Sequence, residues 1–306
     1  MFVYAARRLI DVIPVLVVIT LLAFLVFYLD PSDPVVMIAG EHATPEIEAG
    51  IRARLGLDQP AHLQYLTFMG NTFQGDFGTS YRSRQPVVDH IAPAFVATLY
   101  FTGAAFVLML LIGIPAGIVS AAKPNGWADR LVMSTVLIGL SAPIFWVGIV
   151  LMYVFAFRLG WFPTGGFFHW TGIVLPAVTL ALQYGAIVAR VTRTSMLEVL
   201  GNDYIRTARA KGASNATILF RHALRNASLP IVTTIGLQVG SMLGGTILIE
   251  TVFAWPGLGR MLVNAILERD APIVQSGVML IAVAVLVLNL ATDVVYGLLD
   301  PRVRFS

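Results

Sequence analysis

The chain has 306 residues, of which 57% are hydrophobic and 12% charged, and its formal net charge is +3. The charged share is about half of that in a soluble domain, and the mean hydropathy of +0.80 is too high for a water-soluble globule. Composition therefore excludes a disordered chain and an ordinary soluble enzyme, and it predicts an all-α, polytopic membrane protein. The absence of cysteine excludes disulfides, thiolate metal sites and cysteine nucleophiles.

Six apolar segments are long enough to cross a bilayer as helices, since a crossing needs about 20 residues. The segments cover residues 9–29, 99–122, 131–157, 172–191, 229–253 and 274–299. The first segment follows Arg7 and Arg8 as in a signal peptide, but no A-x-A cleavage site follows it. We therefore interpret it as a retained helix, and we expect residues 1–306 to form a single transmembrane domain.

The distribution of lysine and arginine predicts the orientation. With the amino terminus inside, 13 of the 20 basic residues face the cytoplasm. The other seven basic residues would lie outside, and four of them are in the long first loop, where the positive-inside rule is weak. We therefore expect both termini to be cytoplasmic. Because the basic residues lie in the loops between spans, they indicate topology, and we expect no nucleic-acid partner.

Two loops are long. The outer loop, residues 30–98, carries eight acidic residues, and Ile47, Ile51 and Leu55 recur in it at helical spacing. It is either a contact for an outer partner or a solvated cap. The cytoplasmic loop, residues 192–228, is basic and has no linker composition, so we expect it to fold as short helices.

The sequence carries no pattern that supports catalysis. It has no H-E-x-x-H motif and no Walker A motif, so the chain is not expected to hydrolyse ATP itself. All five histidines lie outside the spans, and no carboxylate lies near a span midpoint. We therefore expect no catalytic residue, no metal site and no cofactor on this chain. A membrane enzyme and a stand-alone secondary carrier are the alternatives, and the second would need a midplane ionisable residue or a pore-lining polar ring.

The fifth span has Gly236, Gly240 and Gly244 at four-residue spacing. Small residues on one face let helix backbones approach closely. Two interpretations follow: the face serves packing alone, or the helix lines a translocation path at a subunit seam. The candidate path residues are Gln238, Gly240, Ser241 and Gly244.

The cytoplasmic loop contains a short helical pattern over residues 204–213. Asn202 or Asp203 is placed to cap the start of this helix, and Gly212 is placed to end it. The pattern alternates small residues with arginine and lysine. One interpretation is a solvated loop resting on anionic lipid, and the other is a helix that docks into a groove on a cytoplasmic partner.

A second helical stretch is expected from Ile218 to about Asn226. The blocks 206–212, 221–226 and 229–230 together resemble the EAA loop of ABC importer permeases, in the form of the dipeptide/oligopeptide/nickel branch. Arg206 replaces the glutamate of the general EAA pattern and Thr207 replaces its first alanine, as is usual in this branch. Other blocks resemble the family in the same order, at residues 55–60, 64–65, 75–80, 250–260 and 300–302.

The resemblance implies the type I ABC importer permease fold in the cytoplasmic (inner) membrane of a bacterium or archaeon. It implies four kinds of partner: a second homologous permease, two ATP-binding subunits that hold ATP and Mg, an extracytoplasmic solute-binding protein, and the lipid membrane. The implied cargo is a dipeptide, an oligopeptide or glutathione, with a nickel complex as the alternative. The compact first loop is more like that of the dipeptide and glutathione members.

The resemblance also assigns roles to residues. The ATPase-coupling role falls on Arg206, Thr207, Ala208, Arg209, Ala210, Lys211, Gly212 and Ala213. The outer gate or the contact with the binding protein falls on Glu250, Trp255, Pro256, Gly257 and Arg260. For Trp255 the alternative is an anchor at the membrane interface.

Overall fold

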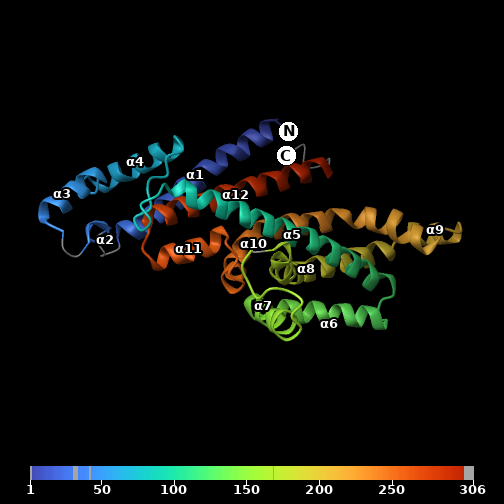
Figure 1. Ribbon diagram of the computed structural model, residues 1–306. Helices are drawn as coiled ribbons and strands as arrows, with labels where there is room; N and C mark the ends of the chain where they lie inside the picture. The colour runs from blue at the N-terminus through green and yellow to red at the C-terminus, as the bar shows by residue number, and fades with distance from the viewer. Residues whose placement is uncertain (1, 30–33, 41–42, 168, 300–306) are drawn as a thin grey trace. The chain divides into compact units, whose positions relative to one another are not determined.

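The computed structural model describes residues 2–29, 34–40, 43–167 and 169–299 (Figure 1). Within these ranges the regular structure is helical, apart from an isolated bridge between Thr79 and Pro86, so the all-α prediction is confirmed. The C-terminal motif at 300–302 lies outside the described residues. The chain forms two compact units. Unit 1 holds Thr98–Pro256 and the chain from Val287, and unit 2 holds Phe2–Ala97 with Gly257–Leu286.

Unit 2 contains the outer loop. Its helices are α1 (Phe2–Tyr28), α2 (Pro34–Ala39), α3 (Pro45–Arg54), α4 (Ala61–Phe73), the start of α5 (Val87–Ala122), α11 (Leu258–Leu267) and the first part of α12 (Ala271–Leu299). The expected amphipathic helix is α3. It begins at a proline, has Glu46 and Glu48 in its first turn, and has Arg52 and Arg54 in its last, so its charges match the helix dipole.

The core of unit 2 forms where three helices meet. Val87 and Ile91 on α5 pack with Leu258 and Leu262 on α11 and with Val274 on α12. This apolar cluster packs α11 against the beginnings of two long helices, α5 and α12.

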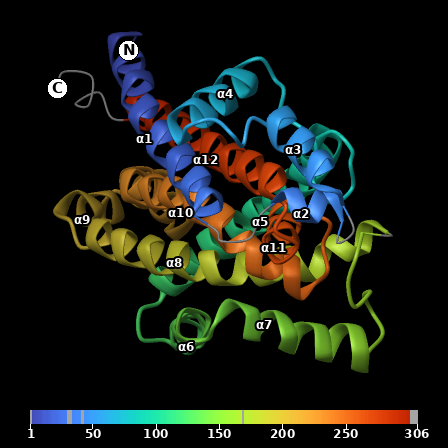
Figure 2. The same ribbon diagram turned by 90° about the vertical axis from the view of Figure 1, so that its left-hand side faces the viewer.

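Unit 1 is a bundle around one helix. After α5 come α6 (Trp127–Ser141), α7 (Ile144–Leu151), a π-helical turn η1 (Met152–Arg158), a 3₁₀ turn η2 (Trp170–Ile173), α8 (Val174–Leu200), α9 (Asp203–Ala210), the π-helical η3 (Thr217–Leu224) and α10 (Arg225–Val252). Helix α8 is 61% buried over its apolar window, against 22–39% for the other long helices. It packs against α6, α7 and α10 and is therefore the centre of this unit (Figure 2).

Four of the six expected spans are long apolar helices among the described residues. They cover Val87–Ala122, Trp170–Leu200, Thr217–Val252 and Ala271–Thr292. The first expected span lies on α1, which runs over Phe2–Tyr28 and includes the apolar stretch Ile13–Tyr28.

The third expected span, residues 131–157, is not one straight helix. It breaks between Ser141 and Ile144, where the chain bends by 112° from α6 into the α7–η1 helix. The cause is Pro143, because its ring disfavours helical geometry at the residue before it. Ala142 is accordingly extended, with ψ of 136°. The prediction of a single continuous helix here was wrong: the two pieces form either one broken span or a re-entrant loop.

Candidate functional site

Helix α9 carries the residues predicted to couple to an ATPase. Its Ile205 is fully buried, whereas nearly all the other residues of α9 are exposed. The helix packs against η3 within unit 1. One apolar side chain therefore anchors the helix, and the predicted coupling residues at 206–213 are exposed, except that Ala208 and Ala213 are half-buried.

Gly212 ends α9 as predicted. Its φ is +83°, a left-handed conformation that glycine adopts without a Cβ penalty. The Gly212 N–H donates to the Arg209 carbonyl at 2.9 Å, and the Ala213 N–H donates to the Ala208 carbonyl at 3.1 Å. These two bonds make a Schellman motif, which satisfies the last carbonyls of the helix and turns the chain sharply.

The start of α9 differs in detail from the prediction. Asn202 occupies the N-cap position with extended backbone, but its side chain makes no capping hydrogen bond. The nearby Tyr204 hydroxyl instead accepts a hydrogen bond of 3.1 Å from the Asn226 amide. This contact links the start of α9 to the start of α10.

The second helical stretch does not end near Asn226, so that prediction was wrong. Residues Thr217–Val252 form one continuous apolar helix, in which η3 runs directly into α10. Pro230 lies inside α10 and does not end it. The helix begins beside Ser214, whose hydroxyl oxygen accepts the Thr217 N–H at 3.3 Å. Helix α9 therefore packs on the first part of a helix that continues to Val252.

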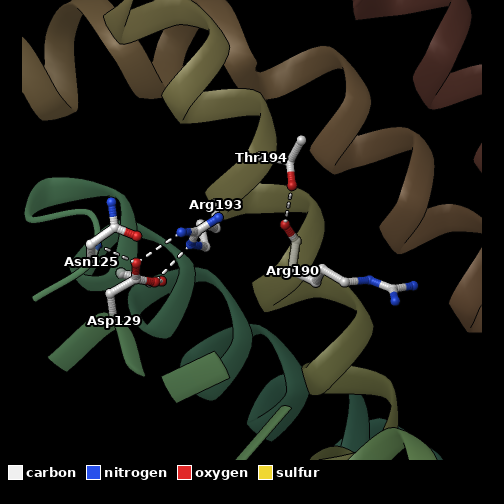
Figure 3. A network of polar contacts seen from close by, with 6 residues as sticks. Asn125, Asp129, Arg190, Arg193 and Thr194 are labelled. Carbon is white, nitrogen blue, oxygen red and sulfur yellow. Dashed lines mark hydrogen bonds and ion pairs between the residues drawn. The ribbon is translucent and has the colours of Figure 1, made fainter. Parts of the chain in front are cut away.

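An ion pair between the buried Asp129 and the half-buried Arg193 joins α6 to α8 in unit 1 (Figure 3). Asp129 on α6 accepts hydrogen bonds from Arg193 on α8, at 2.7 Å from Nε and 2.8 Å from Nη2. The same carboxylate accepts the Asn125 N–H at 2.8 Å and the Ser120 hydroxyl. The guanidinium of Arg190 points away from the pair. The α5–α6 connection is therefore locked to α8 ten residues before α9 begins.

Sequence reasoning missed this pair. Arg193 was counted only as a topology signal, and Asp129 lies 64 residues away along the chain. No local pattern joins two residues so distant in sequence, and only the packing of α6 on α8 brings them together.

The candidate path residues on α10 divide between two faces. Gly240 is half-buried, and a Cβ there would lie 2.9 Å from the Asn289 amide oxygen on α12. Gly244 and Ser241 are exposed, and a Cβ on Gly244 would meet no atom within 4 Å. Gly240 is therefore a close-packing glycine, whereas Gly244 and Ser241 lie on a free face of unit 1; Gln238 is half-buried.

The predicted gate residues Glu250 and Trp255 are fully buried in unit 1. Glu250 accepts a hydrogen bond of 2.6 Å from the Thr98 hydroxyl. The Trp255 ring lies 4.7 Å from that of Phe167, edge to face, and 6.0 Å from that of Phe101. A buried indole packed between two phenylalanines is a core residue, so the interpretation of Trp255 as an interfacial anchor was wrong.

The other three predicted gate residues differ in exposure. Pro256 is exposed and ends unit 1. Gly257 is buried as the N-cap residue of α11, and Arg260 is half-buried in the first turn of that helix. A surface contact is thus available at Pro256 and Arg260 but not at Glu250 or Trp255 in this conformation.

Two family descriptions match the chain. Residues 113–305 match "Binding-protein-dependent transport system inner membrane component", and residues 1–102 match the N-terminal membrane component of the same kind of system. The chain is 43% identical over 303 residues to the glutathione transport system permease protein GsiC of Salmonella paratyphi A, covering 99% of each chain. The GsiC protein of Escherichia coli is similar to the same extent.

Solved structures show a related fold. The MetNI methionine ABC transporter in an inward-facing conformation matches with a TM-score of 0.60 and 19% identity, over 69% of this chain and 96% of that chain. A second match is an amino acid ABC transporter crystallised with histidines, with a TM-score of 0.52 and 17% identity, over 69% of this chain and 92% of that one.

Proposed function

Because the chain belongs to the family of binding-protein-dependent transport system inner membrane components, we propose that it carries glutathione or another short peptide across the membrane. The chain is an ABC importer permease, a transport subunit and not an enzyme, and it works with ATP-binding subunits and a binding protein. The observation that carries the cargo proposal is the 43% identity to GsiC over 303 residues. A nickel complex is the alternative cargo.

Helix α9 is proposed as the contact for an ATP-binding subunit. Its exposed cations Arg206, Arg209 and Lys211 suit an acidic groove, and Ala210 permits close approach. Ile205 and the Schellman turn at Gly212 hold the helix in shape, so a push on α9 would move η3 and α10 as a rigid body. We propose that this motion switches the path between its outward-facing and inward-facing states.

The free face of α10 is proposed as part of the path at the seam with a second permease. Ser241 and Gly244 offer small polar and open surface there. Glu250 and Trp255 would then lie beneath the outer gate as buried supports, and Pro256 and Arg260 would meet the binding protein.

The assembly is proposed to hold one second permease, two ATP-binding subunits that carry ATP and Mg, and one extracytoplasmic binding protein. Both termini of this chain would be cytoplasmic, in the inner membrane of a bacterium or archaeon. The excess of basic residues in the loops that would then be inside supports this orientation. The two compact units would act as a single permease domain.

Uptake by the reconstituted importer tests this function. The permease, its ATP-binding subunits and its binding protein are placed in liposomes that enclose ATP, and labelled glutathione, a dipeptide and a nickel chelate are offered outside. We expect accumulation of glutathione or the dipeptide that stops when a non-hydrolysable ATP analogue replaces ATP. Accumulation of the nickel chelate alone would support the alternative cargo. Uptake driven by an ion gradient without ATP would support a secondary carrier.

A further inference from the structure

Unit 2 contains a cavity that the proposed transport path does not use. Its volume is about 1090 Å³, close to the upper end of the size of small-molecule sites. The outer end of α1, the α3–α4 connection, α4, the turn at 76–84 and residues 269–275 line it, and all of them belong to unit 2. A concave site of this size fits a small molecule better than the flat face of a folded protein.

The cavity concentrates positive charge in an acidic part of the chain. The outer loop, residues 30–98, holds eight acidic residues and four arginines. Three of those arginines line the cavity together with Arg269: Arg52, Arg54 and Arg84. Among the described acidic residues of the loop, Asp76 alone lines it. Asp76 also accepts the Gly78 N–H at 2.9 Å, and the Arg84 guanidinium donates to the Ile38 carbonyl, so part of the hydrogen-bonding capacity of both side chains is used within unit 2.

The backbone is strained at two of these arginines. Arg84 has φ of 62° and Arg269 has φ of 55°, in the left-handed region that costs about 1–2 kcal/mol for a residue with a Cβ. Asparagine or glycine would adopt this geometry more easily, and yet both positions hold arginine at the cavity wall. Strained positions of this kind cluster at binding and catalytic sites.

Asp270 fixes the wall that carries both strained arginines. Its buried carboxylate accepts hydrogen bonds from the Ser80 hydroxyl and from the Tyr81 N–H, the latter at 3.1 Å. The turn that carries Arg84 is therefore tied to the segment that carries Arg269. A site built on such supported turns is preorganised and loses little entropy on binding.

The remaining lining suits a peptide. Guanidinium groups pair bidentately with carboxylates. Amide side chains at Gln59, Asn71 and Gln275 match peptide N–H and C=O groups, and aromatic rings such as Phe68 and Phe77 offer apolar contact. We propose that this cavity binds short peptides through a free carboxylate, at a site on the permease itself. The choice of peptides as the ligand class rests on the proposed function.

Direct binding to the full chain tests the proposal. The chain is placed in nanodiscs of neutral lipid, without binding protein or ATP-binding subunits, and titrated calorimetrically with glutathione, with a dipeptide and with the same dipeptide amidated at its C-terminus. We expect saturable one-to-one binding of the free acids, and about tenfold or more weaker binding of the amide, because a charge-assisted hydrogen bond is lost. Absence of saturable binding, or equal binding of acid and amide, would overturn the proposal.

Two variants locate the site. R54Q combined with R269Q should weaken peptide binding about tenfold or more. R82Q is the matched control, because Arg82 is exposed in the same outer loop but does not line the cavity, and it should bind as the wild type does. Equal losses in both variants would contradict the assignment. Thermal unfolding of each variant establishes that it is folded, and the acid–amide comparison on the wild type needs no variant.

Two further measurements distinguish the peptide site from a lipid-headgroup site and from the proposed transport function. If nanodiscs with anionic lipid abolish peptide binding, the cavity is a lipid-headgroup site and the proposal is wrong. ATP-driven uptake by the complete importer is measured on the same preparation. Uptake without binding to the chain alone would refute the cavity site and leave the proposed function standing. Binding without uptake of any peptide would refute the proposed function and leave the site standing.

Discussion

Arg193 on α8 holds Asp129 on α6 through two hydrogen bonds, of 2.7 Å and 2.8 Å, and the Asp129 carboxylate is almost wholly buried (Figure 3). This pair locks the α5–α6 connection to the central helix of unit 1. If α9 receives the push of an ATP-binding subunit as proposed, we expect the pair to keep α6 and α8 fixed to one another while η3 and α10 move.

The first prediction concerns this pair. D129A leaves the Arg193 guanidinium without its partner, and because that side chain is 24% exposed we expect a loss below the about 3–5 kcal/mol of a fully buried pair. The double variant D129A/R193M should lose less stability than the sum of the single variants D129A and R193M. Thermal unfolding of the purified chain measures all four proteins. Strictly additive losses would contradict the ion pair.

The second prediction concerns the turn at Gly212. G212A places a Cβ on a residue with φ of +83°, which costs about 1–2 kcal/mol and weakens the turn that ends α9. We expect intact membrane insertion, reduced uptake and ATP hydrolysis that continues without transport, with G212D more severe. Gly201 is the matched control, since it lies in the same loop with φ of −76°. If G212A and G201A transported equally well, Gly212 would have no special part in coupling.

The third prediction separates two glycines four residues apart. G240L forces a side chain against Asn289, so it should lower the unfolding temperature of the chain. G244L enters open space, so it should leave that temperature unchanged and reduce uptake or pairing with the second permease. Thermal unfolding and uptake are measured for both. Wild-type uptake by a folded G244L protein would remove Gly244 from the path.

The fourth prediction concerns Tyr81 in the outer loop. Burial, reinforced by the negative charge of Asp270, raises the pKa of Tyr81 from 10.0 to about 12. The unfolded chain therefore releases this proton first, and the contribution of Tyr81 to stability, complete below pH 10, falls as the pH rises from 10 to 12. Absorbance titration of phenolate in the wild type and in Y81F measures the difference. The difference between the two titration curves reports Tyr81. If that difference showed a midpoint near pH 10, Tyr81 would not be buried as described.

Local patterns predicted part of this molecule well. The turn at Gly212 followed from one glycine after a helical pattern, because its chemistry is contained in a few neighbouring residues. The break at Pro143 was missed although its cause is equally local, since an apolar window registers composition and not chain direction. A proline inside an apolar segment should therefore be read first for its effect on the residue before it.

The rest depended on tertiary packing. Trp255 is buried because Phe101 and Phe167, from distant parts of the chain, cover its ring. Of the two interpretations of the glycine face, packing holds at Gly240, over which α12 lies, whereas a path at the uncovered Gly244 stays a prediction. No spacing along α10 distinguishes these two glycines, and only the position of the neighbouring helix does.

Crosslinking from α9 tests the central claim most directly. The chain has no cysteine, so A210C places a single thiol on the exposed face of α9, and F73C places one on the exposed end of α4 as a control. A photoactivatable crosslinker is attached to each variant, and the complex is purified from its native membrane and analysed by mass spectrometry. The account predicts that A210C crosslinks to an ATP-binding subunit and that F73C does not. Failure of A210C to crosslink in a complex that contains that subunit and still transports would contradict the coupling role of α9.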